Sequence, residues 1–278
     1  MALLFAKTNT QEPQYAVSTE FNAKQVRHGY FGRTGGVSTG PYDSLNAGLG
    51  KTAEGDHLDA IYENRRRIAG AMKLPVGRLL SLAQDHTTRC WSINEPQYME
   101  TRPVGDAMVT NKLGVGLGVL TADCAPVLFH ADSSSIEAPY GVVGAAHAGH
   151  KGARTGVLEQ TIVAMQDFGV KPSEITAVIG PCIGPDSYEV SKGFETDFLK
   201  EDPATWQYFR EGKTPDKLMF DLPGYVMHRL KRAGVQNVSW VGTDTVPEEG
   251  QYFSHRRTTL AGQTKRGLQM SVISLKHS

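Results

Sequence analysis

Between Asp106 and His147 the chain holds four short apolar segments in close succession, and this run constrains the fold more than any other feature. The segments read DAMVT, GVGLGVLTA, APVLFHA and YGVVGAAH, in a stretch that is also rich in glycine, proline and serine. Short runs of small and β-branched residues with such breakers are typical of strands. We therefore expect these four segments to form a central sheet.

Apolar residues at helical spacing flank this region on both sides. A helix is expected from Asp56, whose side chain can cap it, to Met72. We expect further helices at 155–168, 193–200 and 222–233, further strands at 78–83, 175–179 and 270–275, and a basic loop at 253–262. Strands that alternate with helices favour an α/β (α+β) fold with mixed central β-sheets flanked by helices.

No low-complexity linker divides the 278 residues. We expect one catalytic domain over residues 26–278, with residues 1–25 as an N-terminal extension packed on it. The three cysteines, Cys90, Cys124 and Cys182, are an odd number and lie far apart. This spacing argues against a disulfide framework and for a reducing compartment.

The charge balance excludes several classes of partner. Lys and Arg together number 29, as do Asp and Glu, so no basic surplus can neutralise the phosphates of a nucleic acid. The N-terminus lacks the features of a signal peptide, and no window approaches the roughly 20 apolar residues that span a bilayer. We expect a cytoplasmic monomer that acts on a small molecule and binds neither nucleic acid nor membrane.

Three residues with metal-binding side chains, His86, Cys124 and His147, each follow an apolar strand-like run. If the three strand ends converge on one edge of a sheet, they supply three ligands and leave a fourth zinc position open, as in catalytic zinc sites. A structural zinc ion would need four ligands, and the chain has no close pair of cysteines. A thiolate beside an imidazole also suits nucleophilic catalysis, with Cys124 as nucleophile and His147 as base.

Two segments could bind an anion. His147 to Gly152 form a turn from a strand into a helix, where free backbone N–H groups favour negative charge and Lys151 could add a positive charge. The glycine-rich stretch from Val26 to Gly50 contains Arg33, which could supply a two-pronged donor for phosphate or a sugar hydroxyl. The alternative for Arg33 is a surface turn with a solvated side chain.

Several ordered motifs together resemble one known family: RTGGVSTGPYDSLNAG, the Gln84 and His86 pair, GDAMVT, TADCAPVLF, AAHAGHKGA, IGPCIGP and FSHRR. The resemblance covers roughly residues 26 to 275. It is to the family once labelled multicopper polyphenol oxidase or laccase domain, whose members are now described as purine nucleoside phosphorylases.

The resemblance implies a single mixed α/β domain with one zinc ion held by His86, Cys124 and His147, copper being the less favoured metal. It implies phosphorolysis of adenosine, inosine, guanosine and methylthioadenosine, with adenosine deamination alongside. Arg33 and Asn46 match family positions suited to phosphate or ribose contacts. Laccase chemistry is rejected, because the nine histidines include no His-x-His pair.

The chain departs from the family pattern after His147, where His150 and Lys151 stand in place of the usual Trp-Arg. Lys151 keeps the charge but loses the two-pronged donor. His150 replaces an aromatic wall with a titratable ring, which could line the pocket or reach the metal. Two further readings of the chain stay open: a Cys-His amide hydrolase, and a non-catalytic module that binds a nucleoside or a protein.

Overall fold

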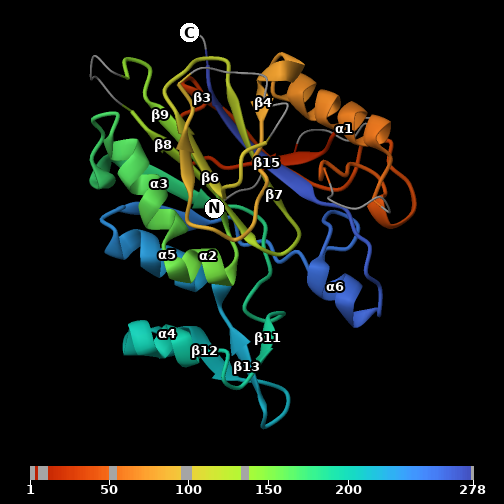
Figure 1. The fold of residues 1–278 in the computed structure, drawn as a ribbon, viewed down its shortest axis with the longest axis vertical. Coiled ribbons are helices and arrows are strands. Elements are labelled where there is room, and N and C mark those ends of the chain that lie inside the picture. Colours follow the sequence, from red (N-terminus) through yellow and green to blue (C-terminus); the bar gives the residue numbers. More distant parts are fainter. Residues whose placement is uncertain (1–3, 6–11, 50–54, 95–101, 133–137, 277–278) are drawn as a thin grey trace.

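The computed structural model describes residues 4–5, 12–49, 55–94, 102–132 and 138–276, and the described strands form two large sheets and one small one (Figure 1). The first sheet runs in the order β1 (Leu4–Phe5), β2 (Tyr15–Val17), β3 (Val26–Phe31), β15 (Gln269–Leu275), β7 (Gly116–Thr121), β4 (Leu79–Leu80). The second runs β14 (Asn237–Trp240), β10 (Ile175–Ile179), β8 (Ala125–Ala131), β9 (Val142–Ala148), β6 (Ala107–Thr110), β5 (Cys90–Ser92). The small sheet runs β11 (Glu189–Ser191), β13 (Lys217–Phe220), β12 (Phe209–Glu211).

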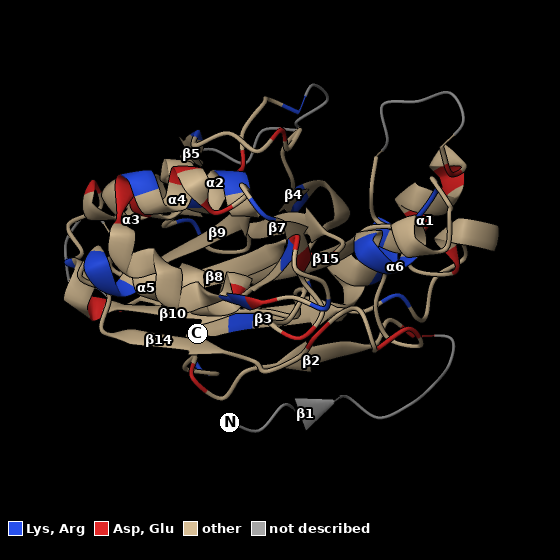
Figure 2. Ribbon diagram, turned by 90° about the horizontal axis from the view of Figure 1, so that it is seen from below, with Lys and Arg blue, Asp and Glu red and all other residues tan. Residues whose placement is uncertain are grey.

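Helices cover the outer faces of both large sheets, as the alternation of strands and helices predicts (Figures 1 and 2). The helices are α1 (Leu58–Ala71), α2 (His150–Thr155), α3 (Val157–Gln166), α4 (Thr196–Glu201), α5 (Leu222–Arg232) and α6 (His255–Leu260), with short 3-10 turns at 40–42, 76–78, 172–174 and 203–208. Of these, α1 packs on the first sheet and α3 and α5 pack on the second, whereas α4 lies beside the small sheet. Both large sheets are mixed: β4 is parallel to β7, and β10 is parallel to β14, while most other pairs are antiparallel. The predicted α/β (α+β) class with mixed sheets flanked by helices is confirmed.

The alternating residues of each central strand face two different hydrophobic cores. On β8, Leu128 packs into the core between the two large sheets, whereas Val127 and Phe129 pack into the core under α3 and α5. On β7, Val119 faces the core between the sheets and Leu120 faces the core under α1. Side chains that alternate with period two explain why these strands are apolar throughout: both of their faces are buried.

Charged side chains lie outside these layers. The central strands β7, β8, β9, β10 and β15 contain no Lys, Arg, Asp or Glu. Figure 2 shows both signs of charge interspersed over the helices and loops, with the sheets almost free of them. Among the described residues, no helix combines the length and the apolar character that crossing a membrane requires.

Several predicted elements agree with the structure. β8 and β10 have the predicted bounds, and α5 ends one residue before the predicted 233 and buries Val226 and Leu230. The predicted strand at 270–275 extends one residue further back, to Gln269. The predicted strand at 78–83 is much shorter: β4 contains only Leu79 and Leu80, and Ala83 makes a single bridge.

Other predictions about elements are wrong. Asp56 does not cap α1, because its carboxylate accepts from the backbone N–H of the adjacent His57 and the helix starts at Leu58 without a side-chain cap. The helix predicted at 155–168 starts at His150 and is interrupted at Gly156, whose φ of 110° no helix accommodates. Residues 255–260 form α6 in place of the predicted loop.

The described part of the predicted N-terminal extension belongs to the first sheet. Ala16 on β2 pairs with Tyr30 on β3, and Phe5 on β1 pairs with Ala16. Residues 4–5 and 15–17 therefore continue the sheet at its edge. A domain boundary between residues 25 and 26 stays a prediction.

Candidate metal centre and its cavity

The predicted ligands meet where the two large sheets join. His86 lies in the loop between β4 and β5, Cys124 lies in the link between β7 and β8, and His147 lies near the end of β9. Each link crosses from the first sheet to the second, so the three residues come from both sheets and not from the edge of one sheet. One ligand atom from each residue lies within 4.8 Å of the other two.

The backbone is unusual at two of these positions. His86 has φ 55° and Asp123, directly before Cys124, has φ 87°. Residues other than glycine rarely adopt this left-handed region, and such conformations persist only where the surroundings stabilise them. Sharp turns at both sites therefore bring the ligand side chains out of their strands and toward each other.

Asp106, at the start of β6, provides that stabilisation for two of the ligands. Its fully buried carboxylate lies 2.8 Å from His147 Nδ1 and accepts hydrogen bonds from the backbone N–H groups of Asp85, His86 and Thr87. The bond to Nδ1 orients the imidazole and leaves Nε2 to bind a metal. The sequence analysis missed this role, although an aspartate that opens a buried strand was a usable signal.

Electrostatics favour the charged forms of this cluster. Burial alone raises the pKa of Asp106, but the hydrogen bond and the charge of His147 outweigh it and lower the pKa to about 2. Burial opposes charge at Cys124 as well, yet His147 and His86 together lower the pKa of its thiol to about 6. For His147 burial is outweighed by the Cys124 thiolate and the Asp106 carboxylate, which raise its pKa. Cys124 is thus a thiolate at neutral pH, the form that binds metal.

Gly149 allows the ligand side chains to come this close. A Cβ atom at this position would lie 2.9 Å from His86 Cδ2 and 3.0 Å from Cys124 Sγ. Contacts below about 3 Å are repulsive, so any side chain here would push the ligands apart. The glycine between His147 and α2 is therefore part of the site.

The three residues fit a zinc ion. Cys124 Sγ and His86 Nε2 are 3.9 Å apart, close to the ~3.5 Å that separates two ligands on one tetrahedral zinc ion. The donor set of one thiolate and two imidazoles suits zinc, and three protein ligands leave a position for substrate or water.

A cavity of about 460 Å³ opens onto the ligands. Apolar and aromatic side chains line much of it: Leu120, Ile183, Tyr188, Leu222 and Leu268, besides the ring of His150. The cavity is large enough for a nucleoside-sized ligand. The three metal-ligand residues, His86, Cys124 and His147, form part of its wall.

Two arginines line the cavity, and no described carboxylate forms an ion pair with their guanidinium groups. The Nε atom of Arg266 is buried and has no hydrogen-bond partner. The Arg256 guanidinium lies 5.4 Å from the centre of the Tyr188 ring, and its backbone N–H donates to Asp123. The charges of Asp123 and Cys124 act on Arg266 without an ion pair, so both guanidinium groups keep donors for an anionic ligand. FSHRR was expected to be a basic loop and is one of the family motifs, but neither Arg256 in it nor Arg266 was predicted to bind substrate.

The structure places three of the predicted substrate-binding residues elsewhere. Arg33 donates to the carbonyls of Asp43 and Glu249 and stacks on Phe253, and buried Asn46 accepts from the backbone N–H of Leu268. Lys151 is exposed on α2. None of the three lines the cavity, so direct substrate contact stays a prediction for them. Arg33 and Asn46 support the segments that do line it.

His150 lines the cavity, but it is not a member of the metal-binding group found among the described residues. Its Nδ1 atom lies 3.1 Å from the Tyr188 hydroxyl group. His150 was expected either to line the pocket or to reach the metal, and the structure supports a place in the pocket wall.

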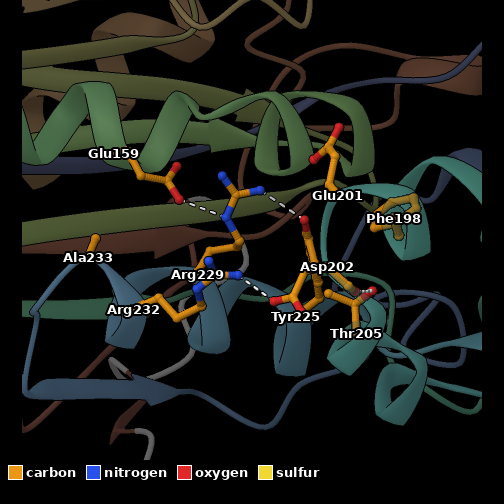
Figure 3. Close-up of a pocket in the computed structure, with 9 residues that line it drawn as sticks. All are labelled: Glu159, Phe198, Glu201, Asp202, Thr205, Tyr225, Arg229, Arg232 and Ala233. Atoms are coloured by element: carbon orange, nitrogen blue, oxygen red, sulfur yellow. Dashed lines mark hydrogen bonds and ion pairs between the residues drawn. The ribbon is translucent and has the colours of Figure 1, made fainter.

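A second cavity, of about 270 Å³, lies between α3, α4 and α5 (Figure 3). Its charged side chains bond to one another: Arg229 Nε lies 2.7 Å from Glu159 Oε1, and Arg232 pairs with Asp202. Because these opposite charges are paired with each other, they are poorly available to bind a charged ligand. They connect the helices that cover the second sheet.

Comparisons with known proteins identify the family of this chain. The family model described as multi-copper polyphenol oxidoreductase laccase matches residues 27–276. The chain belongs to this family.

Among the relatives in the laccase family, a purine nucleoside phosphorylase from Deinococcus radiodurans is 36% identical over 241 residues, 87% of each chain. Purine nucleoside phosphorylase YfiH from Escherichia coli is 35% identical and covers 83% of this chain and 88% of its own. Among solved structures, YlmD from Geobacillus stearothermophilus superposes with a TM-score of 0.82 at 28% identity over 98% of both chains. Protein NMB0706 from Neisseria meningitidis superposes with a TM-score of 0.79 at 33% identity over 99% of both chains.

Proposed function

We propose that this protein is a zinc-dependent purine nucleoside phosphorylase, which converts adenosine, inosine, guanosine or methylthioadenosine and phosphate into free base and the 1-phosphate of the sugar. One observation supports this most: a metal-ligand cluster and two arginines without carboxylate partners line the same cavity. The names of the relatives point to the same reaction.

Phosphate binds at Arg256 and Arg266 in this proposal. Burial lowers the pKa of Arg266, and a bound anion offsets the cost of keeping that cation away from water. The purine lies against the apolar side of the cavity formed by Ile183, Tyr188 and Leu222. The sugar then lies between the base and the phosphate.

In phosphorolysis a phosphate oxygen forms a bond to the anomeric carbon while the bond from that carbon to purine N9 breaks. The electron pair of the broken bond goes to the purine, which takes up the proton that the attacking hydrogen phosphate loses. Arg256 and Arg266 hold the nucleophile in line with the breaking bond, which removes much of the entropic cost of the encounter. A zinc ion at His86, Cys124 and His147 supplies a Lewis acid that polarises a substrate oxygen or water. Asp106 keeps His147 oriented throughout.

A phosphate titration tests this placement. With inosine as substrate, Arg266→Ala should raise KM for phosphate at least tenfold, because a charge-assisted bond is lost, while KM for inosine changes less. Lys151→Ala tests the rival site at the start of α2 and should change neither constant by more than about twofold. The reverse pattern, with Lys151 sensitive and Arg266 insensitive, would place phosphate elsewhere.

Adenosine deamination is proposed for the same cavity. Water adds at purine C6, ammonia leaves, and inosine is the product. Ammonia release from adenosine in the absence of phosphate would support it, provided that Cys124→Ala abolishes the release. Release that survives in the variant would assign it to another site or a contaminant.

A Cys-His amide hydrolase is the alternative activity, and the low pKa of Cys124 is the observation that favours it. A metal ion would occupy the thiolate and reduce its nucleophilicity. If alkylation of Cys124 by iodoacetamide is equally fast with and without one equivalent of zinc, the metal-site assignment is wrong. Absence of any turnover would favour the third reading, a binding module.

A further inference from the structure

His150 is the first residue of α2 and lines the cavity beside the metal-ligand cluster. Its ring is half-buried and lies 5.0 Å from the ring of Phe194, centre to centre, and 6.5 Å from that of Tyr188. These neighbours hold the imidazole in the wall of the cavity. Of its two nitrogen atoms, Nδ1 faces the Tyr188 hydroxyl group at 3.1 Å.

This contact selects one form of the imidazole. Burial raises the pKa of Tyr188, so the phenol keeps its proton, and burial lowers the pKa of His150, so the ring is neutral. Among the described residues, Nδ1 of His150 is the one hydrogen-bond partner of the phenol. Because a phenol O–H is a stronger donor than an imidazole N–H, and an imidazole nitrogen a stronger acceptor than a phenol oxygen, we infer that the O–H group donates to Nδ1 and that the ring proton is on Nε2. His150 can therefore offer the cavity a donor and no acceptor.

Two other side chains with acceptor oxygens in the wall, Gln84 and Asp123, are already engaged. The amide of Gln84 bonds to Leu120 through both its oxygen and its nitrogen. The carboxylate of Asp123 accepts from Thr245, Ser254 and the backbone of Arg256. The polar groups left to meet a ligand include the donors His150, Arg256 and Arg266, besides the Thr121 hydroxyl group and the His255 ring.

We propose that His150 recognises the C6 edge of the purine as a hydrogen-bond donor only, so that the site prefers 6-oxopurines to 6-aminopurines. This inference rests on the proposed purine site. Hypoxanthine and guanine carry a carbonyl oxygen at C6 that accepts from Nε2–H. Adenine carries an amino group there, so two donors would face each other and each would lose a partner in the cavity.

Calorimetric titration with free bases tests the preference without turnover, because neither base can be phosphorolysed. The zinc-loaded protein should bind hypoxanthine about tenfold more tightly than adenine, the size of effect expected for one hydrogen bond gained against one donor left unpaired. Equal binding, tighter binding of adenine, or no binding of hypoxanthine would overturn the proposal.

Three variants separate donor recognition from simple packing. His150→Phe keeps a ring but has no donor, so hypoxanthine affinity should fall to the level of adenine. Tyr188→Phe frees Nδ1, which lets the imidazole present either a donor or an acceptor. His150→Gln can likewise turn its amide either way. In both of these variants adenine should gain affinity while hypoxanthine keeps most of its own.

The base preferences of these variants test whether His150 acts as the donor and whether Tyr188 fixes its form. If Tyr188→Phe, with unchanged circular dichroism and zinc content, keeps the preference of the wild-type protein, then Tyr188 does not set the form of His150 and the inference fails. If His150→Phe keeps the preference, another group reads C6. A protein that prefers hypoxanthine in this assay but releases no base from inosine would refute the proposed activity and leave this inference intact.

Discussion

Single residues determine how closely the three ligands approach one another, and Gly149 is the most restrictive of them. Gly149→Ala would place a methyl group 2.9 Å from the His86 ring and 3.0 Å from Cys124 Sγ. Since neither neighbour can withdraw without leaving the site, we expect the variant to fold but to bind less than a tenth of the zinc of the wild-type protein. Metal content after dialysis measures this.

Gly250→Ala is the matched control for that variant, because no atom lies within 4 Å of the added methyl group. It should keep one zinc ion per chain. Full zinc content in Gly149→Ala would mean that the ligands do not converge beside this glycine.

Asp106 acts on the metal through His147 and the loop at His86. Asp106→Asn keeps the size of the side chain but removes the charge that five hydrogen-bond donors share. Substitution of such outer partners commonly reduces metal affinity 10- to 100-fold, and we expect a loss in that range. Competition with a chelator measures it. Unchanged affinity would show that Asp106 only supports the fold.

His28 makes stability depend on pH, far from the metal site. Burial, then the charge of Lys276 and the neighbouring His130, lower its pKa from 6.5 to about 4. The unfolded chain therefore takes up a proton first as the pH falls, and the free energy of unfolding should drop by roughly 3 kcal/mol between pH 6.5 and pH 4. Urea unfolding at several pH values should show a shallower drop for His28→Gln. If the free energy of unfolding falls equally steeply with pH in the wild-type protein and in His28→Gln, His28 is not the cause of the pH dependence.

At the scale of elements, the accuracy of prediction from sequence follows the apolar pattern. Strands such as β10 are buried on both faces and stand out as apolar runs. α6 has no buried residue and is stabilised at its start by Ser254, which accepts from the backbone of Arg257, so no periodic pattern could reveal it. The interruption of the helix at Gly156 could not be predicted from the sequence either, because a glycine within a helical pattern does not by itself end a helix.

The helices over the second sheet are joined by a half-buried ion pair. Arg229 on α5 bonds to Glu159 on α3 and to Tyr225 (Figure 3). Arg229→Ala leaves both partners with lost hydrogen bonds, so we expect it to reduce the free energy of unfolding by about 2 kcal/mol. The control is Arg66→Ala, whose exposed guanidinium pairs with Glu63 in water, so its loss should leave the free energy of unfolding nearly unchanged. Equal effects in urea unfolding would contradict this role for the buried pair.

At the scale of the whole molecule, the site exists because two sheets meet. The sequence identified His86, Cys124 and His147 as candidates through their side-chain chemistry and their positions after apolar runs. It could not show that the chain crosses from the first sheet to the second at His86 and at Cys124, next to the strand that holds His147. The place of Arg256 and Arg266 in the cavity wall could not be predicted from the sequence for the same reason. Whether an arginine lines a cavity or lies on the surface depends on which other segments of the chain surround it.

The proposed activity is tested most directly by the fate of phosphate. Zinc-loaded protein is incubated with inosine and phosphate, and the reaction is followed by phosphorus NMR together with quantification of hypoxanthine. We predict one new sugar phosphate ester for every hypoxanthine released, an equal loss of inorganic phosphate, and no release from Cys124→Ala. Hypoxanthine released while inorganic phosphate stays constant, or no release at all, would contradict the proposal.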